Sequence, residues 1–232
     1  MTRITLGGDW SGAAESLDTF GCARVEGVLP PAACDEVRAL YDRETLFRSR
    51  IVMARHGFGS GEYKYFADPL PAWLTAMRAA LYGHLAPVAS RWLTAMGGEA
   101  MPADHAAFLA RCRAAGQTKP TPLLLRYGAG DWNALHQDIY GSVVFPMQMA
   151  VLLSRPGEDF TGGEFVLTEQ RPRLQSRAEV VTLTQGDAVV FATRERPVAG
   201  TRGTYRVRLR HGVSRIRGGS RMTLGVILHD AE

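Results

Sequence analysis

The runs TYRVRLRH (residues 204–211) and RMTLGVILH (residues 221–229) decide how the second half of this 232-residue chain folds. In the first run apolar residues alternate with arginines, and the apolar face ends in His211. In the second run Arg221 and Thr223 share a face with small and apolar residues. A period of two is typical of β-strands that bury one face, so both runs predict strands.

The same alternation recurs from residue 121 onward. It predicts seven short strands, at residues 122–127, 142–153, 163–168, 179–183, 188–192, 204–211 and 221–229. Turn-forming sequences such as Gly-Ala-Gly-Asp and Gln-Gly-Asp separate them. Short strands at this spacing indicate a double-stranded β-helix, that is, a jelly-roll or cupin-like barrel of two sheets.

The first half of the chain reads as mixed α and β structure. Its predicted elements are strands at 21–28 and 47–56, a helix at 31–41, two helices within 70–96 that Pro87 separates, and a helix at 102–115. Helices ahead of a jelly roll would cover one sheet from outside, which gives an α+β fold. We expect one domain over residues 1–232, in which 1–119 form a support and a substrate loop and 120–232 form the jelly-roll core.

The composition is that of a globular protein without membrane segments. Apolar residues make up 46% and charged residues 22% of the chain, which argues against disorder. The longest uncharged stretch, residues 139–154, is shorter than the ~20 apolar residues of a membrane-spanning helix. The first residues contain no apolar secretory signal, and the three cysteines form no CxxC pair. We therefore expect a reduced, cytoplasmic protein with no membrane partner.

His136-Gln137-Asp138 and His211 carry the strongest chemical signal. Residues i and i+2 of a strand point to the same side, so His136 and Asp138 can bind one metal ion together. A histidine from another strand would complete a set of two imidazoles and one carboxylate, the ligand set of non-haem Fe(II) oxygenases. Arg221 on an inner face is costly to bury unless an anion such as a carboxylate pairs with it. This combination is hard to explain by packing alone.

Six motifs, in order along the chain, resemble the core of the Fe(II)/2-oxoglutarate-dependent dioxygenases. They are Tyr127-Gly-Ala-Gly, His136-x-Asp138, Gly162-Gly163-Glu164-Phe165, Gly186-Asp187-Ala-Val-Val-Phe191, His211-Gly-Val213 and Gly219-x-Arg221. The match covers roughly residues 120–229 and is most similar to the branch that contains prolyl hydroxylases. More narrowly, the chain resembles a bacterial family of this superfamily that is provisionally linked to nucleic-acid oxidation.

The resemblance implies an iron site and a co-substrate site. The implied Fe(II) ligands are His136, Asp138 and His211. Arg221 would pair with the distal carboxylate of 2-oxoglutarate, whose oxo-acid end chelates the iron. Tyr127 matches the tyrosine of the family's first barrel strand that reaches this co-substrate.

Two further residues are expected near the co-substrate. Thr223 shares the inner face of Arg221. Prolyl hydroxylases carry another tyrosine on the strand after the metal motif, where residues 147–153 have none, and Gln148 is the polar candidate there. The implied reaction uses O₂, converts 2-oxoglutarate to succinate and hydroxylates a C–H bond, with ascorbate as an accessory reductant. If the attacked carbon is an N-methyl group, the hydroxymethyl product falls apart and the result is demethylation.

Residues 55–66, RHGFGSGEYKYF, are the most informative segment outside this core. Three glycines permit a mobile loop, and aromatic side chains beside basic ones could stack a base and hold its phosphates. The substrate candidates are Arg55, His56, Tyr63, Lys64 and Tyr65, together with Trp132 and Asn133 just ahead of the metal motif. The alternative is an ordinary glycine-rich loop whose rings pack onto the helices.

Basic residues gather at the end of the chain. The net charge is +4, and residues 194–232 hold 9 basic and 3 acidic side chains. Strand parity turns the arginines of residues 204–211 outward, where solvent or acidic side chains would surround them. Arg194, Arg196 and Arg202 lie in loop-like sequence and could reach a polyanion such as a nucleic acid.

Three function classes remain open. An enzyme that oxidises nucleic acid would bind a single-stranded or damaged strand, and its binding would weaken steeply with salt. A prolyl-type hydroxylase would hold an extended peptide in a groove with little salt dependence, and a small-molecule substrate is open as well. A non-enzymatic cupin-like protein that binds a small acid would keep the barrel. It would give no reason for the iron ligands and Arg221 to occur together.

Overall fold

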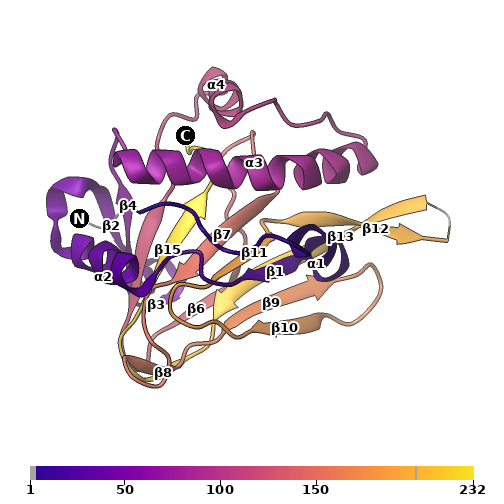
Figure 1. Cartoon of the computed structure of the whole chain (residues 1–232). Helices are drawn as coiled ribbons and strands as arrows, with labels where there is room; N and C mark the ends of the chain where they lie inside the picture. The colour runs from indigo at the N-terminus through magenta and orange to yellow at the C-terminus, as the bar shows by residue number, and fades with distance from the viewer. Residues whose placement is uncertain (1–3, 202) are drawn as a thin grey trace.

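Two antiparallel β-sheets face each other in the computed structural model, which describes residues 4–201 and 203–232 (Figure 1). The α-helices of these ranges are α1 (Ala13–Phe20), α2 (Pro31–Ala39), α3 (Ala72–Ala95) and α4 (His105–Ala114). α3 lies across the outer side of the larger sheet and α4 lies beyond it (Figure 1). The predicted α+β fold, a jelly roll with helices on one sheet, is confirmed.

The larger sheet has seven strands and forms one wall of the barrel. Their order is β1 (Cys22–Val25), β11 (Ala188–Ala192), β7 (Met147–Leu152), β15 (Arg221–Ile227), β5 (Leu123–Tyr127), β4 (Glu62–Phe66) and β2 (Phe47–Val52). The 3₁₀ turns η1 (Leu40–Asp42), η2 (Glu44–Leu46) and η3 (Met53–His56) flank its β2 edge. β15 lies between β7 and β5 at the centre of the sheet, so its residues are buried on both faces.

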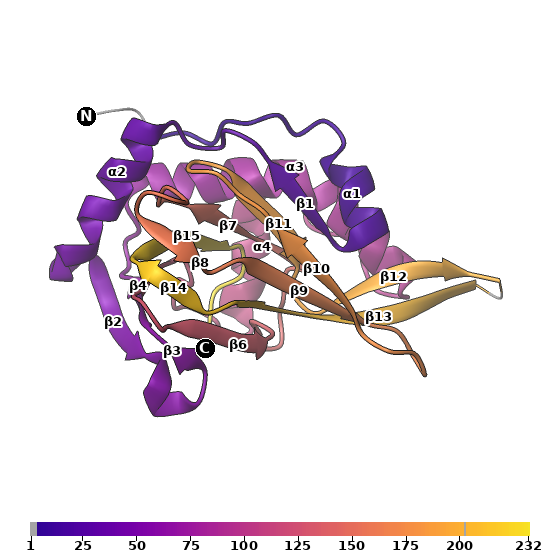
Figure 2. The same ribbon diagram turned by 90° about the horizontal axis from the view of Figure 1, so that it is seen from below.

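The smaller sheet forms the opposite wall (Figure 2). Its strand order is β10 (Arg177–Val181), β9 (Phe165–Gln170), β13 (Gly203–Val213), β6 (Trp132–His136) and β3 (Gly59–Ser60). β12 (Glu195–Gly200) pairs with the first half of β13 in a hairpin that projects from the body of the molecule (Figure 2). β14 (Ile216–Gly219) and β8 (Phe160–Gly162) form a separate pair.

The alternation predicted for β13 is present in the structure. Val207, Leu209 and His211 are buried on the inner face, whereas Arg206, Arg208 and Arg210 on the other face are exposed. Arg206 and Arg208 each lie 3.6 Å from the Glu195 carboxylate, and Arg206 also donates a 2.7 Å hydrogen bond to the Met96 carbonyl oxygen. The hydrophobic pattern therefore fixes which face of β13 turns toward the barrel interior.

The expected break at Pro87 is wrong, because α3 runs without interruption past this residue. Proline in a helix interior removes one hydrogen bond and costs ~3 kcal/mol. Leu81, Leu85 and Trp92 on either side of it are fully buried, and their burial against the sheet outweighs that cost. In the described ranges no helix is both long and apolar enough to cross a membrane.

Several other element boundaries differ from the prediction. Residues 142–146 are not part of β7, because Pro146 has no N–H to donate to a neighbouring strand. Residues 53–56 form η3 rather than the end of β2. Residues 59–66, expected as part of a mobile loop, form β3 and β4. The sequence also did not predict α1, β6, β8, β12 and β14.

Candidate metal centre

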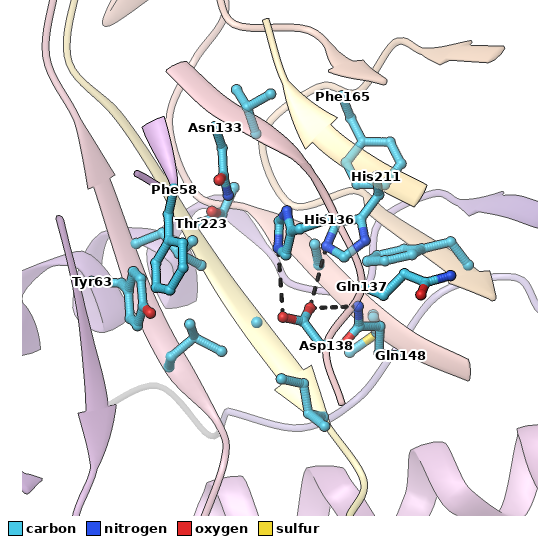
Figure 3. Close-up of a pocket in the computed structure, with 18 of the residues that line it drawn as sticks. Phe58, Tyr63, Asn133, His136, Gln137, Asp138, Gln148, Phe165, His211 and Thr223 are labelled. Carbon is cyan, nitrogen blue, oxygen red and sulfur yellow. Dashed lines mark hydrogen bonds and ion pairs between the residues drawn. The ribbon is translucent and has the colours of Figure 1, made fainter. Parts of the chain in front are cut away.

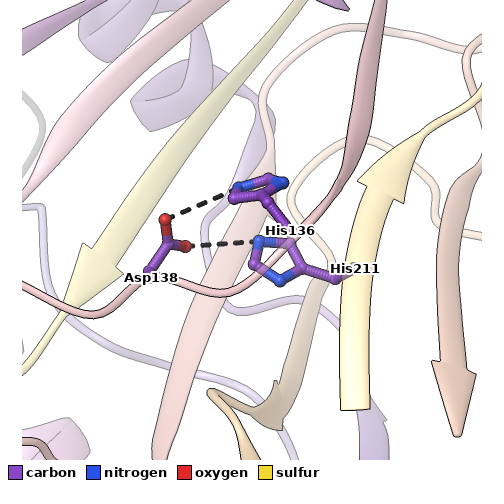
Figure 4. Close-up of side chains that lie close together, drawn as sticks. All are labelled: His136, Asp138 and His211. Atoms are coloured by element: carbon purple, nitrogen blue, oxygen red, sulfur yellow. Dashed lines mark ion pairs between the residues drawn. The ribbon is translucent and has the colours of Figure 1, made fainter. Parts of the chain in front are cut away.

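His136, Asp138 and His211 meet on the inner face of the smaller sheet (Figure 4). The register of β6 on β13 places His136 directly opposite His211, and Asp138 follows two residues after His136. The Nε2 atom of His136 lies 3.5 Å from Asp138 Oδ1, and that of His211 lies 3.3 Å from Asp138 Oδ2. All three donor atoms lie within 4.8 Å of one another, which is the donor set that Fe(II) takes in non-haem oxygenases.

A β-bulge shapes the strand that carries this motif. The register of β13 on β6 shifts by one residue between His211 and Val213. As a result, Asn133 and His136 both line the same cavity although they are three residues apart. Gly212 permits the close approach, because a Cβ atom there would lie 2.7 Å from the Asn133 carbonyl oxygen. The bulge also removes the simple alternation from β6, which explains why the sequence did not predict this strand.

The hydrogen bonds of the two histidines leave their Nε2 atoms facing Asp138. The Nδ1 atom of His136 lies 2.7 Å from the Ala134 carbonyl oxygen, which can only accept, so Nδ1 carries a proton and Nε2 is the ring nitrogen that faces Asp138. Nδ1 of His211 is buried without a hydrogen-bond partner among the described residues. This arrangement suits metal ligation through both Nε2 atoms.

Charge in the triad is set by burial and by mutual contacts. Burial raises the pKa of Asp138, but hydrogen bonds and charge from the two histidines outweigh it and hold that pKa well below its usual range. Burial, together with the charge of His136, lowers the pKa of His211. An ionised carboxylate beside a neutral imidazole is the state that binds a divalent metal.

Arg221 is a buried cation that lines the same cavity. Its side chain is 3% exposed, and Nε and Nη1 have no hydrogen-bond partner in the described part of the chain. Burial lowers the pKa of Arg221 to about 10, with Tyr127 and Glu164 opposing the shift, so the guanidinium is still charged at neutral pH. A buried charge without a partner is costly, and a bidentate carboxylate would satisfy it.

The cavity between the triad and Arg221 has a volume of about 310 Å³. The predicted residues that line it are Tyr63, Tyr127, Asn133, His136, Asp138, Gln148, His211, Arg221 and Thr223. The Tyr127 hydroxyl accepts a hydrogen bond of 3.3 Å from Asn133 Nδ2. Phe58 and Tyr63 lie across the cavity from the triad (Figure 3). The structure therefore brings together a metal-ligand set, an unpaired cation and an aromatic wall.

Gln148 and Tyr140 contact Asp138 rather than a co-substrate position. Gln148 was expected to contact the co-substrate. In the structure its Nε2 donates a hydrogen bond of 2.8 Å to Asp138 Oδ2. The Tyr140 hydroxyl donates a 2.7 Å hydrogen bond to Asp138 Oδ1. Tyr140 was not predicted from the sequence, although its position two residues after Asp138 could have indicated a contact with that residue.

Five of the predicted substrate residues, Trp132 among them, do not line the cavity. Lys64 is 3% exposed and its ammonium lies 2.6 Å from Glu44 Oε1, because alternation along β4 turns it away from the cavity face of Tyr63. Tyr65 is 8% exposed and donates to the Tyr140 hydroxyl. Arg55 and His56 are exposed on η3 outside the cavity.

The substrate contact expected of Trp132 stays a prediction, whereas the polyanion contact expected of Arg196 needs correction. Trp132 is 45% exposed and lies outside the cavity lining. Arg196, expected to reach a polyanion, is 2% exposed and lies 2.6 Å from Glu169 Oε2. It also donates to the carbonyl oxygens of Asp18 and Thr19 at the end of α1, so its charge stabilises the fold. Arg202 lies outside the described residues.

Comparison with protein families gives a match over most of the chain. Residues 61–231 match the model of Oxygenase-NA, a family described as "Oxygenase, catalysing oxidative methylation of damaged DNA". Two uncharacterized proteins of Mycobacterium tuberculosis, MT2286 and Rv2227, are each 50% identical over 167 residues, which is 72% of this chain and 72% of theirs.

Solved structures share the fold at low sequence identity. A Pseudomonas putida prolyl-4-hydroxylase gives a TM-score of 0.56 at 15% identity, over 94% of this chain and 96% of that one. An oxidoreductase of the 2OG-Fe(II) oxygenase family from Burkholderia pseudomallei gives 0.56 at 15% identity, over 100% and 97%. A Trichoplax adhaerens prolyl hydroxylase in complex with a hypoxia inducible factor peptide gives 0.59 at 12%, over 93% and 86%.

At this low identity the solved structures show only a shared fold, whereas the family match also shows what kind of protein this is. It sets aside the hypothesis of a non-enzymatic protein that binds a small acid. The donor set of the triad agrees with an oxygenase that uses iron. The chain belongs to the Oxygenase-NA family and is an oxygenase.

Proposed function

We propose that this enzyme removes a methyl group from a damaged nucleic-acid base by hydroxylating the methyl carbon. The observation that carries the proposal is one cavity of about 310 Å³ that joins the metal-ligand triad, the unpaired Arg221 and an aromatic wall. Each of these three parts suits one of the components that the reaction needs: iron, 2-oxoglutarate and a planar substrate.

In this proposal, His136, Asp138 and His211 hold Fe(II) through the atoms that already converge. When bound, the iron supplies the oxidation of a C–H bond to C–OH, coupled to the conversion of 2-oxoglutarate and O₂ to succinate and CO₂, with ascorbate as an accessory reductant. Arg221 binds the distal carboxylate of 2-oxoglutarate, and Thr223, 4% exposed on the same face, orients it by hydrogen bonding. Tyr127 and Asn133, which are hydrogen-bonded to each other, keep water away from the bound 2-oxoglutarate.

The substrate part of the proposal rests on the mouth of the cavity and on the family. Phe58 and Tyr63 offer rings opposite the triad, where a flat base can stack with its methyl group toward the metal (Figure 3). Hydroxylation of an N-methyl group gives a hydroxymethyl amine that releases formaldehyde, so the base regains an N–H. The family's description speaks of oxidative methylation; a hydroxylation adds oxygen and no carbon, so we propose removal of a methyl group.

The test is succinate release by Fe(II)-loaded protein supplied with 2-oxoglutarate and a single-stranded oligonucleotide. The oligonucleotide carries N-methylated bases in one reaction and is unmodified in its twin. We expect release of succinate and formaldehyde with the methylated strand only. Equal, slow succinate release with both strands would contradict the nucleic-acid substrate. It would favour the peptide hydroxylation or small-molecule oxidation that the sequence also leaves open.

A further inference from the structure

Asp138 receives a hydrogen bond on each of its carboxylate oxygens from a residue outside the triad. Tyr140 donates 2.7 Å to Oδ1 and Gln148 donates 2.8 Å to Oδ2. We infer that Tyr140 and Gln148 are positioning residues that clamp the Asp138 carboxylate in the orientation that binds the metal. The inference rests on the iron site of the proposed function and adds two residues to it.

The clamp matters because Asp138 lies outside the strand that holds His136. β6 ends at His136, and Asp138 lies in the irregular segment that follows. Gln148, in contrast, is 2% exposed and lies on β7 within the larger sheet. The clamp thus ties a carboxylate on an irregular segment to a rigid element of the opposite sheet. This is how outer residues orient metal ligands in other proteins.

Both clamping hydrogen bonds have a fixed direction. An ionised carboxylate only accepts, so the group that Gln148 presents to Asp138 is its amide nitrogen. The same argument makes the Tyr140 hydroxyl the donor to Asp138, whether or not Tyr65 donates its own 3.0 Å hydrogen bond to Tyr140.

The clamp also limits how Asp138 can approach a metal. A carboxylate has about four lone-pair sites, two on each oxygen. Tyr140 and Gln148 occupy one site on each oxygen, and the Nε2 atoms of His136 and His211 face the remaining ones at 3.5 and 3.3 Å.

The experiment measures binding of Co(II), a spectroscopic stand-in for Fe(II), to the full chain without 2-oxoglutarate or substrate. We compare the parent with Tyr140→Phe, which keeps the ring, and Gln148→Met, which keeps an unbranched side chain. Loss of an outer-shell partner of this kind costs about 10- to 100-fold in metal affinity. We expect that loss in both variants, and a changed Co(II) absorption spectrum that reports altered coordination.

Tyr65→Phe is the matched control. It removes a buried hydroxyl from the same cluster but leaves both hydrogen bonds to Asp138 in place. We expect Tyr65→Phe to keep the parent spectrum and to bind Co(II) within about threefold of the parent, less than the loss above. Thermal melting of the metal-free proteins shows whether each variant is folded.

Three outcomes would overturn the clamp. One is parental Co(II) affinity and spectrum in folded Tyr140→Phe and Gln148→Met. Another is an equal loss in Tyr65→Phe, because the cluster would then act through packing alone. If the parent itself bound no Co(II), the iron site would fail together with the clamp. A clamp confirmed without stimulation by methylated strands would mean that only the substrate assignment is wrong.

Discussion

The two ends of the cavity are built in different ways. At the inner end Arg221 and Tyr127 lie on β15 and β5, central strands of the larger sheet, and both side chains are buried. At the mouth Phe58 follows the turn η3 and is 48% exposed. The inner end is therefore rigid and suits one invariant co-substrate, whereas a short exposed segment can vary with the substrate. Binding specificity often resides in such segments carried on a rigid scaffold.

Removal of a metal ligand at the inner end of the cavity should have the largest effect on activity. His211→Ala takes away one of three converging donors and its 3.3 Å contact with Asp138. We expect loss of bound Fe(II) and of all succinate release, measured by metal analysis and by turnover. His56→Ala is the matched control, since His56 is exposed and lies outside the cavity. A full equivalent of iron in His211→Ala would remove His211 from the site.

Arg221→Met separates co-substrate binding from metal binding at the same end. A hydrogen bond to a charged group is worth about 1.5–3 kcal/mol, so we expect the KM for 2-oxoglutarate to rise about 10- to 100-fold with iron content unchanged. The Tm of the protein without co-substrate should not fall, because Nε and Nη1 of Arg221 have no hydrogen-bond partner to lose. An unchanged KM would rule out the pairing of Arg221 with the co-substrate.

The parent enzyme should also show a pH limit that Arg221→Met lacks. The pKa of Arg221 is lowered to about 10 by burial, so the guanidinium is charged below that pH and loses its charge above it. Affinity for 2-oxoglutarate should hold from neutral pH up to this value and fall beyond it.

At the mouth, Phe58→Ala should weaken substrate binding and leave the inner end intact. Stacking of one base on an aromatic ring is worth about 1–3 kcal/mol. We therefore expect the KM for the methylated oligonucleotide to rise by about 5- to 100-fold, while the KM for 2-oxoglutarate stays the same. Phe58→Tyr keeps the ring and should behave as the parent does. Equal changes in both KM values would mean that the two ends of the cavity are not independent.

The contrast also explains what the sequence could reveal. His211, Arg221 and Thr223 were predictable because strands with a period of two turn them toward the barrel interior, and His136 and Asp138 were predictable from their His-x-Asp spacing. The mouth was predicted less well, because the glycines of residues 55–66 were interpreted as signs of mobility. A Cβ at Gly59 would lie 2.4 Å from the Trp132 carbonyl oxygen, so the close approach of β3 to β6 requires this glycine. That pairing joins residues more than 70 positions apart, and alternation within one segment does not reveal it.

Substitution of Lys64 has the smallest expected effect, and it tests whether a residue next to the aromatic wall contacts the substrate. Lys64 lies one residue from Tyr63 of the aromatic wall, yet its ammonium contacts Glu44 and the Tyr41 carbonyl oxygen on the other side of β4. Lys64→Met keeps the buried stem and removes the charge, while the exposed Glu44 regains water. We expect a loss of about 1 kcal/mol, which lowers the Tm by about 2–4 °C in a chain of this length. The KM for the oligonucleotide and its dependence on salt should stay as in the parent. A weaker salt dependence in Lys64→Met would instead mean that Lys64 reaches substrate phosphates, and β4 would then have to open when the substrate binds.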